Sequence, residues 1–333
     1  MEQRDISVGG GRYEEHFFDR IISLENLFLA WREFRRGKTK KAETQQFEFN
    51  LEDNLFQLHR ELLEKSYQPR PYKDFYVQDP KSRHIHKANI RDRVLHQAVF
   101  RVLYPIFDKE FVFDSYSCRF NKGVHAAVDR LSSFLRTTSG NGRRKVLVLK
   151  CDIEKFFDSI DQKVLLDLIK RKIKDSEVLW LVRKIIDSYE NQAGLGLPLG
   201  NVTSQLFANI YLHQLDFFVK QRLRIQYYLR YCDDFIFICQ EPDYLQLINQ
   251  VSQFLSNQLG MKLHSRKIVI SKYSQGIDFL GYVLRPHSRV LRIKTKRRLF
   301  KKIKKANSPS YFGVLSHCNG YKIKQKILDI LKQ

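Results

Sequence analysis

Apolar positions along this chain follow two periods, and together they predict an α+β fold. Residues spaced three and four apart predict helices at 21–31, 51–67, 90–107, 162–172, 177–189, 202–220 and 243–259. Asp161 is well placed as the N-cap of the helix at 162–172. Shorter runs rich in β-branched and aromatic residues predict a strand at 145–153 and two hairpins, one at 226–239 and one of strands 72–77 and 82–86, which Asp79-Pro80 separates. No repeat or low-complexity segment interrupts this pattern. We therefore expect a globular chain in which helices pack on antiparallel strands.

The hairpin at 226–239 has two acidic residues at its turn, Asp233 and Asp234. Aspartate is common in turns, so this pair by itself could be simple turn chemistry. Two adjacent carboxylates repel each other and are costly to desolvate, so a fold that aims them inward normally supplies a cation. Mg²⁺ fits this role, because it takes hard oxygen ligands and joins one or two carboxylates to substrate phosphates.

A second acidic strand end lies at Asp152, where the apolar strand predicted at 145–153 leaves the core. Asp152, Asp233 and Asp234 together give three carboxylates from two distant segments. Two-metal phosphoryl transfer requires this layout, because one ion lowers the pKa of an attacking hydroxyl and the other stabilises the leaving pyrophosphate. The sequence therefore predicts a nucleotidyl transferase with two Mg²⁺ ions.

Four short motifs follow one another in the order and rough spacing of the palm motifs of reverse transcriptases. They lie at 152–157, 200–205, 231–234 and 279–282. Most reverse transcriptases have Gln-Gly and then Ser-Pro in the second motif, whereas this chain has Leu199-Gly200 and then Ser204-Gln205. That variant resembles the reverse transcriptases of diversity-generating retroelements, and the likeness runs from about Arg83 to the C-terminus.

This resemblance implies a right-hand polymerase. An N-terminal extension and fingers would occupy residues 1–125, a palm of antiparallel sheet and helices 126–285, and a helical thumb 286–333. The backbone carbonyl of Ile153 would join the three aspartates in holding the two Mg²⁺ ions. The expected reaction adds deoxynucleotides to a primer 3′-hydroxyl on an RNA template.

The resemblance also implies a set of nucleotide contacts. Phe157 would exclude a ribose 2′-hydroxyl by collision, although an aromatic residue at this position could simply complete the core. Leu199 replaces a glutamine that orders the incoming nucleotide, so we expect reduced fidelity, mainly opposite template adenine. Gly200 allows close backbone approach to the nascent pair, and Gln205 belongs to the same motif. Lys267 could act as general acid toward pyrophosphate, or could serve charge balance.

Basic residues of the predicted fingers are further candidates. Arg83 and Arg91 would grip the triphosphate, and Arg119 the template, with surface arginines or a stabilising salt bridge as the alternatives. Histidines also occur here, but their spacing does not support a tetrahedral metal set, so we interpret them as ordinary surface or core residues. They are His84, His86 and His96.

Primer and template contacts are expected toward the C-terminus. Tyr231 precedes the paired aspartates, and a hairpin that positions the primer end is implied at Phe279, Leu280, Gly281 and Tyr282. The segment 292–305 predicts an amphipathic basic helix that follows a nucleic-acid backbone, with a membrane-surface helix as the alternative. Its candidate contacts are Lys294, Lys296, Arg297 and Arg298.

Composition favours a polyanionic partner. Lys and Arg total 59 against 36 Asp and Glu, which gives a net charge of +23 and a pI near 9.8 over 333 residues. Five cysteines without a Cys-x-x-Cys pair favour a reducing cytoplasm over a disulfide framework or zinc site. Without a basic-then-apolar leader or a run of 18 apolar residues, we expect no membrane partner and a cytoplasmic protein. The resemblance implies a bacterial, archaeal or phage origin.

The resemblance implies several partners: a template-repeat RNA, the RNA/cDNA duplex, deoxynucleoside triphosphates and a small basic, oligomeric accessory variability protein. We expect no endonuclease domain after residue 333, so target cleavage would come from elsewhere. Two alternatives stay open. One is a retron or phage-defence reverse transcriptase, although Ser204-Gln205 speaks against a retron enzyme, and the other is a non-catalytic RNA-binding palm protein.

Overall fold

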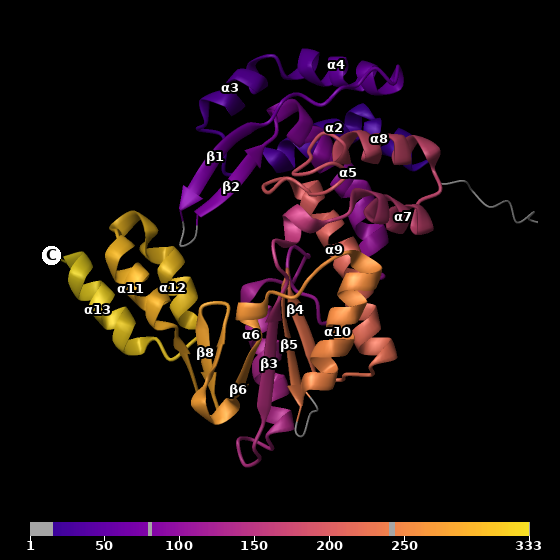
Figure 1. The fold of residues 1–333 in the computed structure, drawn as a ribbon. Coiled ribbons are helices and arrows are strands. Elements are labelled where there is room, and N and C mark those ends of the chain that lie inside the picture. The colour runs from indigo at the N-terminus through magenta and orange to yellow at the C-terminus, as the bar shows by residue number, and fades with distance from the viewer. Residues whose placement is uncertain (1–15, 79–81, 240–243, 333) are drawn as a thin grey trace, which may run out of the picture. The chain divides into compact units, whose positions relative to one another are not determined.

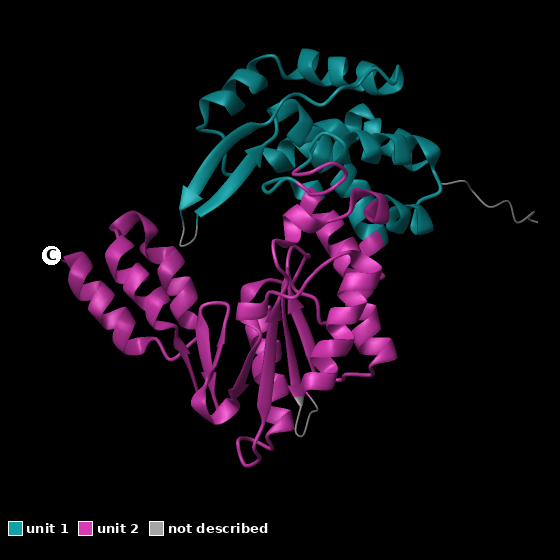
Figure 2. Ribbon diagram, in the orientation of Figure 1, with its two compact units in different colours: residues 1–106, 166–190, 198–203 teal, residues 107–165, 191–197, 204–333 magenta. Residues whose placement is uncertain are grey.

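The computed structural model describes residues 16–78, 82–239 and 244–332 and contains two compact units (Figure 2). Unit 1 comprises residues 1–106, 166–190 and 198–203, and unit 2 comprises 107–165, 191–197 and 204–333. Each unit therefore combines segments that are distant in the sequence. The division into 1–125, 126–285 and 286–333 stays a prediction.

Helices make up most of unit 1 (Figure 1). They are α1 (Phe17–Ile22), α2 (Leu24–Phe34), α3 (Ala42–Phe49), α4 (Leu51–Leu63), most of α5 (Ile90–Asp108) and α8 (Ser176–Ile186). The helix predicted across 21–31 is interrupted at Ser23, whose hydroxyl accepts a hydrogen bond from Asn26 N–H and caps α2. The apolar face of α2 is nevertheless buried as predicted, and the Trp31 ring lies 5.0 Å from that of Phe47.

Unit 1 also contains an antiparallel hairpin of β1 (Lys73–Gln78) and β2 (Ser82–Lys87). This pairing confirms the hairpin predicted from the alternating runs, while the predicted turn at Asp79-Pro80 lies outside the described residues. The second strand is tied to a later segment of the same unit, because His86 N–H donates to the carbonyl of Leu199 over 3.3 Å.

Unit 2 is built on a four-stranded antiparallel sheet in the order β4-β5-β3-β6. The strands are β3 (Leu147–Asp152), β4 (Tyr228–Tyr231), β5 (Asp234–Cys239) and β6 (Val269–Lys272). Both faces are covered. Leu229, Ile236 and Ile238 belong to the hydrophobic cluster around α6 (Val124–Thr138), whereas Tyr228 and Arg230 contact Asp216. Two covered faces explain why β3 and β5 are apolar runs rather than alternating ones.

Further helices of unit 2 follow the predictions closely. They are α7 (Gln162–Lys172), α9 (Val202–Phe217) and α10 (Tyr244–Leu259). The C-terminal part of α7 and the first two residues of α9 belong to unit 1. α9 is followed directly by a π-helical turn, η2 (Phe218–Arg222). Asp161 caps α7 as predicted, since its carboxylate accepts from Val164 N–H over 2.9 Å. Short 3₁₀ turns are η1 (Phe156–Ser159), η3 (Ser265–Lys267), η4 (Tyr273–Gln275) and η5 (Lys305–Asn307). None of the described helices is long and apolar enough to cross a membrane.

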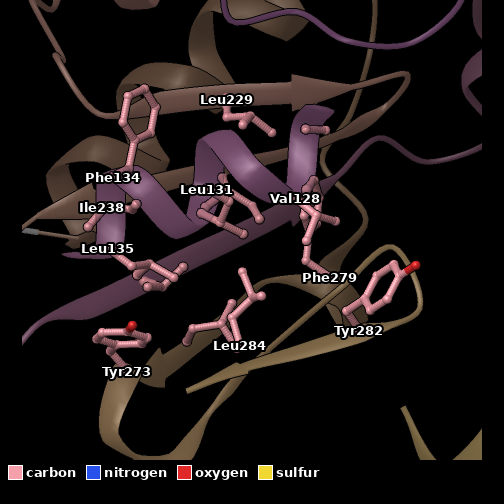
Figure 3. Packing of buried hydrophobic residues seen from close by; sticks show 14 of the residues in the cluster. Val128, Leu131, Phe134, Leu135, Leu229, Ile238, Tyr273, Phe279, Tyr282 and Leu284 are labelled. Carbon is pink, nitrogen blue, oxygen red and sulfur yellow. The ribbon is translucent and has the colours of Figure 1, made fainter. Parts of the chain in front are cut away.

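The C-terminal part of unit 2 pairs a second sheet with three helices. The sheet consists of β7 (Ile277–Phe279), β8 (Tyr282–Arg285) and β9 (Ser288–Leu291), and the helices are α11 (Ile293–Lys302), α12 (Ser308–Ser316) and α13 (Tyr321–Lys332). A single hydrophobic cluster joins them to α6 and to the larger sheet (Figure 3). Leu131 and Leu135 of α6 belong to this cluster together with Ile238 of the first sheet and Leu284 of the second.

Candidate active site

Two neighbouring strands bring the predicted aspartates together. β3 and β5 pair antiparallel with Asp152 directly opposite Asp234, while Cys232 and Asp233 form the two-residue turn between β4 and β5. Opposite residues in such a pair have Cβ atoms about 4.5–5.5 Å apart. Asp152 is 8% exposed and the other two carboxylates are half-buried. The three acidic groups therefore form one cluster at the end of the sheet.

The cluster carries unbalanced negative charge. Burial raises the pKa of Asp233, and the nearby charge of Asp152 raises it further. Burial likewise raises the pKa of Asp234, and the ammonium group of Lys150 opposes this rise. Lys267 Nζ lies 2.5 Å from Asp152 Oδ1, and Lys150 Nζ lies 3.5 Å from Asp234 Oδ1. Three carboxylates face two ammonium groups, which suits the binding of a hard divalent cation.

The residue after Asp152 is held tightly by its backbone. Ile153 is 1% exposed and forms an isolated antiparallel bridge with Leu263, and Glu154 N–H donates to Lys262 O over 2.9 Å. The carbonyl of Asp152 itself accepts from His264 N–H over 2.8 Å. These bonds fix the chain on both sides of the carboxylate.

A buried ion pair that sequence reasoning missed supports the acidic turn. Arg230 is 1% exposed and Asp216 is 0% exposed, and the guanidinium donates to both carboxylate oxygens over 2.7 and 2.6 Å. Arg230 Nη1 also donates to the carbonyl of Cys232 over 3.0 Å, and the Tyr228 hydroxyl donates to Asp216 over 2.7 Å. The bond to Cys232 holds the turn that presents Asp233. The signal in the sequence was a charged residue within each of two apolar segments, Asp216 in the helix α9 and Arg230 in the strand β4.

The other predicted nucleotide contacts of unit 2 lie on neighbouring segments. Phe157 is half-buried in η1, and its carbonyl accepts from Leu197 N–H over 2.8 Å. Lys267 lies within the carboxylate cluster through its contact with Asp152. Gln205 is exposed in the first turn of α9. The structure thus brings Lys267 to the aspartates, while the roles of all three residues stay predictions.

Leu199 and Gly200 belong to unit 1. Leu199 is half-buried and its carbonyl is bonded to His86 N–H, while Gly200 has φ +117°, a conformation that L-residues rarely adopt. A Cβ atom added at Gly200 would meet Ile85 Cγ2 at 3.3 Å. Backbone conformation and close packing on β2 therefore both favour glycine at this position.

The predicted arginine contacts differ in their availability. Arg83 is exposed on β2. Arg91 is 7% exposed and donates to Glu61 and to the carbonyl of Gln68. Arg119 donates to Asp108 over 2.7 Å and to the carbonyl of Val112 over 2.8 Å. These contacts favour the salt-bridge alternative for Arg119, and Arg91 is buried rather than the surface arginine of its alternative. Contact of either residue with substrate or template stays a prediction.

The predicted primer-end residues form the β7–β8 hairpin. Phe279 is 0% and Tyr282 is 2% exposed, and the Tyr282 hydroxyl donates to Val314 O over 3.0 Å. Leu280 and Gly281 form the turn, both with positive φ, and are half-buried. Phe279 and Tyr282 thus belong to the core, and Leu280 and Gly281 are the two predicted primer-end residues that solvent reaches.

The remaining primer and template candidates are more accessible. Tyr231 is half-buried at the end of β4. The basic side chains of α11 are exposed, namely Lys294, Lys296, Arg297 and Arg298. The helix therefore presents a cationic surface, as its amphipathic pattern predicts.

A third group of chemically active side chains lies on the β1–β2 hairpin. Within the described residues, Asp74, His84 and His86 bring one ligand atom each to within 4.8 Å of one another. The sequence alone predicts that His84 and His86 are ordinary residues rather than metal ligands. Their spacing does not reveal Asp74, which strand pairing brings beside them. His96 is separate, since it is buried in α5 and desolvation lowers its pKa to about 3.

Comparisons with known proteins give one matching family model, two related proteins and a structure of similar fold. Residues 77–284, more than half of the chain, match the family model described as reverse transcriptase (RNA-dependent DNA polymerase). The chain is 26% identical to protein YkfC of Escherichia coli strain K12, over 70% of this chain and 71% of that protein. It is also 26% identical to the group II intron-encoded protein LtrA of Lactococcus lactis subsp. cremoris, over 70% of this chain and 50% of that protein, so it spans about half of LtrA. A solved structure of telomerase from Candida albicans, in complex with a TWJ fragment of telomeric RNA, superposes on this chain with a TM-score of 0.50 at 13% sequence identity. The superposition covers 70% of this chain and 49% of the telomerase chain, and it shows that the two share a fold.

Proposed function

The chain belongs to the reverse transcriptase family of RNA-directed DNA polymerases, and we propose that it copies an RNA template into DNA at Asp152, Asp233 and Asp234. The observation that carries the proposal is the pairing of Asp152 directly opposite Asp234, with Asp233 in the adjoining turn. Family membership supplies the reaction class, and the carboxylate cluster is the group of residues best suited to it.

The donor set suits two Mg²⁺ ions, with the three carboxylates and the Ile153 carbonyl as ligands. Bound there, the ions would lower the pKa of the primer 3′-hydroxyl and stabilise the leaving pyrophosphate. Lys267 holds its ammonium Nζ beside Asp152, where it can donate a proton to the departing pyrophosphate. Phe157 follows five residues after Asp152 on the constrained η1 turn, and its ring would collide with a ribose 2′-hydroxyl.

The parts of the polymerase are assigned on the same basis. We assign the four-stranded sheet with α6, α9 and α10 to a palm, and α11–α13 to a thumb. The fingers would consist of the β1–β2 hairpin, which carries Arg83, and the start of α5, which carries Arg91. Residues 1–125, 126–285 and 286–333 are the corresponding ranges. On this assignment the exposed basic residues of α11 follow the backbone of the RNA/cDNA duplex.

Within the family, we propose the diversity-generating type. It is supported by Leu199 in place of glutamine and by Ser204-Gln205 in place of Ser-Pro. An apolar side chain cannot hydrogen-bond the incoming nucleotide, so synthesis would be error-prone and would turn a template-repeat RNA into mutagenic cDNA for retrohoming. This type would work with a basic oligomeric accessory variability protein. The second candidate is a reverse transcriptase of group II intron type, which the likeness to LtrA favours.

Primer extension tests the proposed activity. The full chain should extend a DNA primer on an RNA template with deoxynucleoside triphosphates and Mg²⁺. Asp152→Asn and Asp233→Asn should each lower the rate by on the order of 10²–10³-fold, because each removes a carboxylate that would hold the Mg²⁺ ions, whose positive charge would stabilise the developing negative charge. RNA binding, measured by filter retention, should stay near wild type. Asp53→Asn, at an exposed position of α4, is the control, and undiminished extension by Asp152→Asn would refute the assignment.

A further inference from the structure

A cluster outside the carboxylate site has the composition of a transition-metal site. We propose that Asp74, His84 and His86 on the β1–β2 hairpin bind a divalent cation of the Zn²⁺ class. His86 Nδ1 lies 2.7 Å from Asp74 Oδ1, and His84 Nε2 lies 3.8 Å from Asp74 Oδ2. Asp74 thus lies between two imidazole nitrogens, one beside each of its oxygens.

Strand pairing creates this arrangement. Asp74 is directly opposite His86 in the antiparallel register, and His84 is two residues from His86, so all three side chains project from the same face. The rings of His84 and His86 have centroids 4.2 Å apart. Tyr76, opposite His84, stacks on its ring at 4.6 Å with the planes 7° apart. The hairpin therefore fixes the spacing and the ring orientation of the candidate ligands.

A further contact orients His86 as metal-bound histidines are oriented. Its second ring nitrogen, Nε2, lies 3.0 Å from the Tyr189 hydroxyl, and the two ring centroids are 4.5 Å apart. Histidine ligands generally bond a polar group through the nitrogen that does not face the metal, which fixes their tautomer. When Nε2–H donates to Tyr189, Nδ1 presents a lone pair toward the Asp74 carboxylate. Two acceptors 2.7 Å apart repel each other unless a proton or a metal cation lies between them.

The other tautomer gives the competing account. If the Tyr189 hydroxyl donates to Nε2, then Nδ1–H can donate to Asp74, and the three groups form an ordinary hydrogen-bond chain. That chain accounts for His86 but does not include His84, whose Nε2 lies 3.8 Å from Asp74, beyond hydrogen-bond distance. A shared cation accounts for both histidines.

Ligand type selects the metal. Two imidazoles and one carboxylate favour Zn²⁺, Co²⁺ or a similar ion over Mg²⁺. Tetrahedral ligands about 2.0–2.1 Å from Zn²⁺ lie about 3.3 Å from one another, so the observed 2.7 and 3.8 Å require shifts of about half an ångström. The side chains of Asp74 and His84 are 51% and 40% exposed, which permits such shifts and leaves a fourth position open to solvent.

Metal binding would stiffen the part of unit 1 that carries Leu199. His86 N–H donates to the Leu199 carbonyl, and Ile85 packs beside Gly200. A cation shared by both strands would hold β2, and through it the segment 198–203. An effect of the metal on DNA synthesis through this segment rests on the proposed function of Leu199 at the nucleotide. The binding of the metal itself does not depend on that function.

Co²⁺ titration of the full chain tests the site, because tetrahedral Co²⁺ absorbs visible light far more strongly than the octahedral ion. The wild-type chain, freed of metal with a chelator, should bind a single equivalent with this signal, and Zn²⁺ should displace it. His84→Ala, His86→Ala and Asp74→Asn should lose the signal. His287→Ala, at an exposed position, should keep it. Tyr189→Phe should weaken binding by about 10-fold, because it removes the partner of Nε2.

The same titration in the Asp152→Asn chain separates this site from the carboxylate cluster. The signal should persist there even though DNA synthesis is lost, so failure of the proposed polymerase activity would leave the metal site intact. Circular dichroism establishes that the variants remain folded, and His84→Gln provides a milder replacement. If wild type and His84→Gln bind Co²⁺ equally, or if neither binds, the hydrogen-bond chain is the correct account and the proposal is overturned.

Discussion

Asp152 and Asp234 are directly opposite residues of the β3–β5 pair, on the same face of an antiparallel sheet. Like charges in this relationship destabilise a strand pair. Lys150 and Lys267 neutralise the cluster in part, yet the pKa values of Asp233 and Asp234 stay raised. The sheet therefore keeps like charges together at one strand end, at a cost to the stability of the strand pair.

Magnesium should stabilise the protein through this cluster. At a free Mg²⁺ concentration ten times its Kd, binding adds about 1.4 kcal/mol to the free energy of unfolding, or about 2–4 °C in Tm. Differential scanning fluorimetry with MgCl₂ against NaCl at equal ionic strength measures this shift. Asp152→Asn should lower it and Asp53→Asn should not. Equal shifts in all three proteins would place the bound Mg²⁺ elsewhere.

The Arg230–Asp216 pair should be required for stability. Asp216→Ala leaves a buried guanidinium unpaired and should lower the free energy of unfolding by about 3–5 kcal/mol. Asp278→Ala, which removes an exposed partner of Arg292, should cost less than about 1 kcal/mol. Urea unfolding of both variants compares the two pairs, and similar costs would contradict the role given to the buried pair.

Leu199 should affect fidelity. Leu199→Gln restores a polar contact to the incoming nucleotide, and one net hydrogen bond of about 0.5–1.5 kcal/mol corresponds to roughly a 2- to 10-fold reduction in misincorporation. Sequencing of cDNA made on a defined RNA template measures the error spectrum, where the reduction should appear mainly opposite adenine. Leu245→Gln, at an exposed position of α10, is the matched control, and an unchanged spectrum for Leu199→Gln would exclude the proposed effect.

Phe157 should select the sugar. Phe157→Ala removes the ring that collides with a 2′-hydroxyl and should raise kcat/KM for ribonucleotides relative to deoxynucleotides by about 10–200-fold. Single-nucleotide incorporation measures the ratio. Phe156→Ala is the contrasting variant, because this neighbour is 3% exposed and its loss should lower stability by about 3–5 kcal/mol without changing the ratio. A ratio unchanged by Phe157→Ala would assign Phe157 to the core.

His96 should make unit 1 sensitive to acid. Its pKa is lowered by burial and by Arg93 to about 3, against 6.5 for a free histidine. The unfolded state therefore binds more protons between these values, and stability falls as pH falls below about 6.5. From pH 7.5 to 5.5 this one group should cost about 1.4 kcal/mol. Urea unfolding of His96→Leu should show a correspondingly smaller pH dependence than that of wild type or His287→Ala, and an unaltered pH dependence would show that the pKa of His96 is the same in the folded and unfolded states.

Local pattern was sufficient for much of the fold. The apolar run ending at Asp152 and the hairpin around Asp233 and Asp234 were predicted as strands, and both are strands, because runs buried on two faces carry their signal in every residue. Asp161 was predicted to cap α7 and does so, because capping involves residues three apart. Family membership was likewise visible in four short motifs and is confirmed by the match over 77–284.

Features that depend on pairing between distant segments needed the tertiary structure. The sequence by itself determined which strands end in carboxylates, but only the register of β3 with β5 decided that Asp152 stands opposite Asp234. Asp216 meets Arg230 only because α9 packs on β4, and Asp74 meets His86 only because β1 pairs with β2. Neighbours along the chain set periodicity and turns, whereas the partners of a buried charge or a metal ligand are chosen by how the elements pack.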